Sequence, residues 1–75
     1  MTAESIERVK RYVLSHLDRK DDSYSQAEFH LDNAIAYVRQ GSQYGAEQQI
    51  RCCVHYLNKG GSSEREMARY IENNL

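Results

Sequence analysis

Apolar residues recur at three- and four-residue steps through the central half of the chain, residues 25–59. This spacing is typical of amphipathic α-helices with one buried face, and the glycine-bounded segment 41–45 divides the pattern into two helices. Counting outward from that segment aligns the two apolar series in antiparallel order, as in a helical hairpin. The aligned pairs are Val38 with Ala46, Ile35 with Ile50, Leu31 with Val54, and Ala27 with Leu57.

Local signals predict where the two hairpin helices begin and end. Ser25, followed three residues later by a glutamate, fits the capping box that opens a helix. We therefore expect the first hairpin helix over residues 26–40, ended by Gly41, which can adopt the left-handed conformation without a steric penalty. Ser42 is the expected cap of the second hairpin helix, which ends near Lys59.

Two further helices flank the hairpin. Thr2 is the expected cap of a first helix that runs to about Arg19, and Ser63, in a second capping-box pattern, opens a short last helix. Their apolar stripes are Ile6, Val9, Val13 and Leu17 in the first helix, and Met67, Ile71 and Leu75 in the last. The predicted fold is a single all-α domain over residues 1–75. It is a small bundle of three long helices plus a short C-terminal helix, built on the central antiparallel helical hairpin.

The composition indicates a thin hydrophobic core. Isoleucine, leucine, valine and phenylalanine together supply only 14 of the 75 residues. Chains this short often gain stability from a disulfide, a metal ion or a partner subunit. The chain has six tyrosines and no tryptophan, which favours a partner subunit, because a tyrosine can bury its ring while its hydroxyl stays hydrated.

The charge is balanced along the chain as well as in total. The net charge of −1 divides into +2 over residues 1–20, −2 over residues 21–59 and −1 over residues 60–75, which argues against a strong nucleic-acid or membrane surface. No apolar run reaches the length of a membrane span, and the N-terminus lacks the features of a signal peptide. We expect a cytoplasmic protein in which Cys52 and Cys53 are reduced.

One short stretch combines residues that can ligate a metal or attack a substrate: Cys52, Cys53 and His55. A structural zinc site usually combines two such clusters, and the chain has one. A catalytic cysteine needs a nearby base and a third group that orients the base, and this stretch does not supply both. We therefore expect no metal, no cofactor and no enzymatic activity, with Cys53 serving as a small buried residue.

Direct DNA binding is an alternative hypothesis. Residues 64–71 resemble the first helix of a helix-turn-helix unit, but the sequence stops at Leu75 without the recognition helix that would enter the major groove. The residues that could contact phosphate groups are Arg8, Lys10, Arg11, Arg19 and Lys20. Since Glu4, Glu7 and Asp18 dilute this positive charge, a solvated surface is the simpler interpretation.

The hairpin also carries a resemblance to a known family, over about residues 27–59. The pattern consists of Leu31, Ala34 and Ile35, then Gly41, then Ile50, Val54, His55 and Leu57. With this spacing the chain resembles the small enterobacterial regulators of the biofilm and acid-stress type, the YmgB/AriR connector family. The resemblance implies a dimeric all-helical protein that modulates transcription or two-component signalling by contacting another regulator. It implies no catalytic residues.

These observations predict a small non-enzymatic regulatory protein of a bacterium or phage that acts by protein–protein interaction. We expect it to form a homodimer and to bind an unidentified regulatory protein; a phage-type inhibitor or antirepressor of a host protein is a related alternative. No membrane partner is expected. The residues predicted to contact a partner are Tyr12, Leu14, Tyr37, Tyr44, Tyr56, Met67 and Tyr70.

Overall fold

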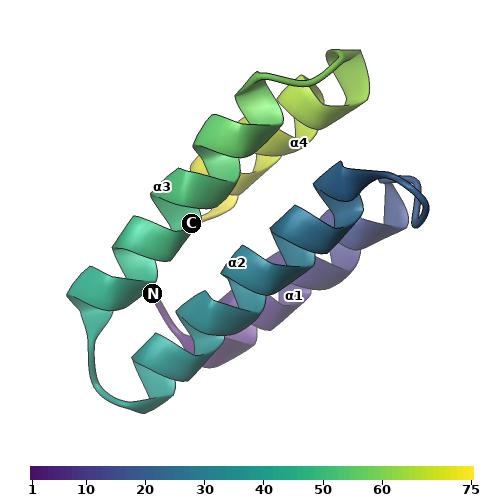
Figure 1. Cartoon of the computed structure of the whole chain (residues 1–75). Coiled ribbons are helices and arrows are strands. Elements are labelled where there is room, and N and C mark those ends of the chain that lie inside the picture. The colour runs from purple at the N-terminus through teal and green to yellow at the C-terminus, as the bar shows by residue number, and fades with distance from the viewer.

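The computed structural model describes residues 1–75 as four helices joined by short connections. The helices are α1 (Ala3–Ser15), α2 (Asp22–Arg39), α3 (Gln43–Asn58) and α4 (Ser62–Asn74). Figure 1 shows them side by side along one direction, with α2 and α3 on one side of the molecule and α1 and α4 behind them. The fold is therefore the predicted all-α bundle with a central helical hairpin. None of its helices combines the length and the apolar character needed to cross a membrane.

The core lies between the four helices and contains 15 buried residues. They are Ile6, Val9, Val13, Leu17, Ala27, Leu31, Ala34, Ile35, Ala46, Ile50, Cys53, Leu57, Met67, Ala68 and Ile71. All of the predicted inner positions of the hairpin are among them except Val38 and Val54, which are half-buried and pack against the edge of the core. The periodicity of the sequence thus predicts most of the buried face correctly.

The turn of the hairpin has the predicted chemistry. Gly41 has a φ of +85°, the left-handed conformation that a residue with a Cβ rarely adopts. Ser42 caps α3, because its Oγ accepts a hydrogen bond from the N–H of Gly45 at 3.1 Å. This turn sets α3 back against α2 in antiparallel order.

Both predicted capping boxes are wrong. Helix α2 begins one turn earlier than expected, at Asp22 after Asp21, and Ser25 is an exposed residue inside the helix. Helix α4 begins at Ser62 after Gly61, and no side chain caps it. In α2 the extra turn is held by packing, since the half-buried Tyr24 contacts the core.

The first helix is shorter than predicted, since α1 ends at Ser15 and not near Arg19. The Ser15 hydroxyl donates a hydrogen bond to the backbone carbonyl of Tyr12 at 2.6 Å, and His16 Nδ1 lies 2.8 Å from the same oxygen. Side chains that occupy a backbone acceptor in this way compete with continuation of the helix. Leu17 still enters the core, but it does so from the connection after α1. Helices α1 and α4 consequently have the same length, 13 residues each.

Candidate interaction surface

The outer side of the α2–α3 hairpin is a surface built by close contacts between the two helices. The ring of Tyr37 on α2 lies against Gly45 on α3 so closely that a Cβ at this glycine would stand 2.5 Å from the ring. Farther from the Gly41 turn, His30 Nδ1 lies 2.8 Å from the side-chain oxygen of Gln49. These contacts fix which residues of the two helices lie side by side on the surface away from α1 and α4 (Figure 1).

We call this surface the hairpin face, and define it by the non-core positions of α2 and α3 that share the side marked by these contacts. From α2 and the residue after it the face takes Gln26, Phe29, His30, Asn33, Tyr37 and Gln40, and from α3 it takes Gly45, Gln48, Gln49, Cys52 and Tyr56. None of these side chains is an Asp, Glu, Lys or Arg, although such residues make up 28% of the chain. Among the charged side chains of the two helices, Asp32 and Arg39 pair with residues of α1, and Glu47 and Arg51 border a depression shared with Leu75 after α4.

Large aromatic side chains are exposed on this face and at its margins. Tyr37 is 38% exposed, Tyr56 37% and Phe29 58%, while Tyr44, beside the turn, is 73% exposed. The sequence predicted three of these four as partner contacts and missed Phe29. Phe29 lies on the side of α2 opposite the buried positions Ala27, Leu31 and Ala34. The helical period of the sequence already places it there.

The remaining predicted contacts do not belong to one surface. The ring of Tyr12 on α1 stacks on that of Tyr70 on α4, with centroids 4.0 Å apart and planes 18° apart, so these two tyrosines contact each other. Leu14 is half-buried and packs against the core. Met67 is only 3% exposed and lies in the core. Its predicted role as a partner contact is therefore wrong, because the α4 stripe that carries it faces the other helices.

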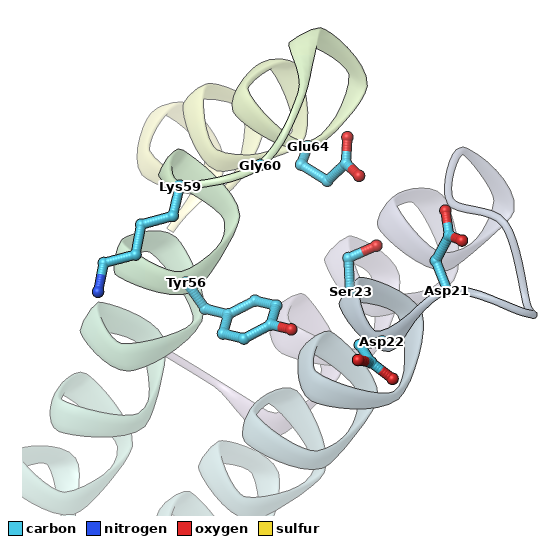
Figure 2. A pocket seen from close by; sticks show the side chains of 7 residues that line it. All are labelled: Asp21, Asp22, Ser23, Tyr56, Lys59, Gly60 and Glu64. Carbon is cyan, nitrogen blue, oxygen red and sulfur yellow. The ribbon is translucent and has the colours of Figure 1, made fainter.

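A polar depression lies at the end of the bundle opposite the turn. It has a volume of about 480 Å³ and is lined by Asp21, Asp22, Ser23, Tyr56, Lys59, Gly60 and Glu64. Figure 2 shows Tyr56 reaching from α3 toward the first turn of α2, with Asp22 and Lys59 on either side of it. The Oγ of Ser23 is buried in its floor and has no hydrogen-bond partner. The hairpin face therefore ends in a short charged margin.

The basic residues of the alternative DNA-binding hypothesis occupy different environments. Lys10 Nζ lies 2.6 Å from Asp32 Oδ1, and this hydrogen bond, opposed in part by desolvation, raises the pKa of Lys10. Arg8 and Arg11 are exposed on α1. Arg19 and Lys20 lie in the connection after α1, where the guanidinium of Arg19 stands 6.0 Å from the ring centroid of Tyr24. One of the five is thus already paired with a carboxylate.

The two adjacent cysteines have opposite environments. Cys52 is exposed near the middle of the hairpin face, whereas Cys53 is buried in the core. Burial raises the pKa of the Cys53 thiol to about 12, with a smaller contribution from Cys52. A thiol with this pKa is protonated at neutral pH and is a poor nucleophile. His55 is exposed one turn along, and no group of three His, Cys, Asp or Glu side chains is placed to hold a metal ion.

Comparison with protein-family models, with curated proteins and with solved structures finds no match to this chain. The resemblance to the YmgB/AriR family therefore stays a prediction.

Proposed function

We propose that this protein is a small non-enzymatic regulatory protein that acts by protein–protein interaction and associates with a second copy of itself. The observation that supports the proposal is the hairpin face, an uncharged surface with exposed aromatic side chains in a chain that is otherwise rich in charge. Interface centres are depleted in charged residues and enriched in aromatic ones. Tyrosine in particular is frequent among the residues that dominate binding energy.

The size of the molecule supports the same proposal. Its 15-residue core is small for independent stability, and covering the hairpin face would remove further apolar area from water. Burying the side-chain amide groups of Gln26, Asn33 and Gln49 costs less than burying charges, provided that they find hydrogen-bond partners. A face of this composition can therefore be covered by a protein partner without leaving a charge unpaired.

The proposed target of the dimer is a transcriptional or signalling regulator. This part rests on the sequence resemblance, which implies a connector that contacts another regulator. It is tested separately by capturing proteins from bacterial lysate with the dimer. Recovery of the same regulator by wild type, and its loss with a variant whose hairpin face is disrupted, is the expected result.

Sedimentation equilibrium tests the self-association. We expect wild type to form a dimer at micromolar concentration and Cys52→Arg to remain a monomer, because the substitution places a charge in the middle of the hairpin face. Asn58→Arg is the matched control: Asn58 is exposed on the same helix but lies off the face. A wild-type protein that stays monomeric at high micromolar concentration would contradict the proposal.

A further inference from the structure

Two charged residues, Asp22 and Lys59, border the hairpin face at one end of the bundle. Asp22 is the first residue of α2, and Lys59 follows the last residue of α3, so both stand at the end opposite the Gly41 turn. Both are exposed and line the same depression around Tyr56 (Figure 2). The ion pairs of the chain lie elsewhere, between Lys10 and Asp32 and between Glu7 and Arg39. Asp22 and Lys59 therefore have no opposite charge bound to them within the chain.

Two copies of the hairpin face can meet around a two-fold axis in two ways. If the axis runs across the helices, α2 lies on α2 of the partner in antiparallel order. The charged margin then meets the uncharged turn end of the other copy. If the axis runs along the helices, α2 of each copy lies on α3 of the other, and the two charged margins are at the same level. In a symmetric interface each contact then occurs twice.

We infer that two copies of this chain associate through the hairpin face with the two-fold axis along the helices, so that Asp22 of each copy pairs with Lys59 of the other. This inference rests on the homodimer proposed above and adds its surface and geometry. Of the two arrangements, this one gives Asp22 and Lys59 an opposite charge across the interface. Asp21 and Glu64 line the same depression, so two acidic side chains per copy lie close to these pairs. In the antiparallel arrangement both charges lose water against uncharged side chains, which costs free energy without compensation.

The area of the face is sufficient for such a dimer. The molecule measures 33 × 18 × 18 Å, so one long face presents about 600 Å² in projection and two facing copies cover roughly 1,200 Å², the lower end of the range for specific interfaces. The accessible area exceeds the projection because side chains make the surface rough. We therefore expect a reversible dimer with a dissociation constant in the micromolar range.

Charge reversal tests the geometry. Asp22→Lys or Lys59→Asp alone places two like-charge pairs in each dimer, and we expect either to weaken dimerisation about tenfold by sedimentation equilibrium at low salt. The double variant, Asp22→Lys with Lys59→Asp, restores both pairs and is expected to return the dissociation constant close to the wild-type value. Asp18→Lys with Lys20→Asp, in the exposed connection after α1, is the matched control and should leave it unchanged.

The outcomes separate the geometry from the proposed function. The geometry with the two-fold axis along the helices would be overturned in either of two cases: if both single reversals leave dimerisation unchanged, or if the double variant fails to restore it. The homodimer itself would stand in both cases. Absence of a wild-type dimer would overturn both. Cys52 supplies an independent measurement. With the axis across the helices, Cys52 lies close to Cys52 of the second copy. With the axis along the helices, it lies on α2 of the second copy. Rapid formation of a Cys52 disulfide between copies under oxidant would therefore also contradict the inference.

Discussion

Ser23 is the buried residue whose side chain lacks a hydrogen-bond partner. It lies in the first turn of α2, is 7% exposed, and occupies the floor of the depression at the end of the bundle. A buried hydroxyl that makes no hydrogen bond lowers stability by the cost of removing it from water, about 1–3 kcal/mol. Its presence there is therefore a local weakness of the fold.

We predict that Ser23→Ala raises the free energy of unfolding, by about 1 kcal/mol more than Ser25→Ala does. Both substitutions gain the same helix propensity, about 0.5 kcal/mol, but Ser25 is exposed, so the difference isolates the buried hydroxyl. Urea denaturation of the two variants and wild type measures it. A destabilised Ser23→Ala variant would show that the hydroxyl has a partner in solution, such as the carboxylate of Asp21 or Glu64.

At the scale of the elements, the hairpin depends on the contact between Tyr37 and Gly45. We predict that Gly45→Ala destabilises the protein by about 1–2 kcal/mol, because the new Cβ overlaps the ring of Tyr37. In a Tyr37→Ala background the same substitution should stabilise α3 by about 0.5–1 kcal/mol through helix propensity. Thermal or urea denaturation of the four proteins of this double-mutant cycle gives the two values.

Gly41→Ala provides the control for that cycle. No atom lies within 4 Å of a Cβ at this position, but the φ of +85° strains any residue that has one. The expected loss of about 1–2 kcal/mol should be the same with and without Tyr37→Ala. An effect of Gly45→Ala that is likewise independent of Tyr37 would mean that the ring does not occupy this position.

The sequence predicted the hairpin, its core and its turn, but not the start of α2 or the end of α1. Buried positions and helix ends depend on different forces. Buried positions such as Leu31 and Ile50 repeat with the helical period, which the sequence shows directly. A helix start depends also on what the first turn packs against. The serine pattern at Ser25 is a local signal, and packing of Tyr24 in the first turn against the core outweighs it.

The hairpin face required the fold for a similar reason. Each of its residues reads as an ordinary polar or aromatic position on one helix, and only the pairing of α2 with α3 joins them into an uncharged surface. The tyrosines were predicted because their number is high for a chain without tryptophan. Met67 was assigned wrongly because an apolar residue on a short final helix can face either the core or a partner, and the sequence does not distinguish the two.

At the scale of the whole molecule, four helices of 13 to 18 residues enclose a core of 15 side chains. Only folded chains of such a molecule dimerise, so the stability of the folded state rises with protein concentration. We predict that the thermal midpoint of wild type rises by about 3–5 °C for each tenfold increase in concentration above the dissociation constant. Calorimetry or circular dichroism at several concentrations measures this dependence.

Cys52→Arg should unfold at a midpoint that does not change with concentration, whereas Asn58→Arg should follow wild type. A wild-type midpoint that is constant across this range would show that the four-helix core is sufficient by itself and that the hairpin face adds nothing to folding.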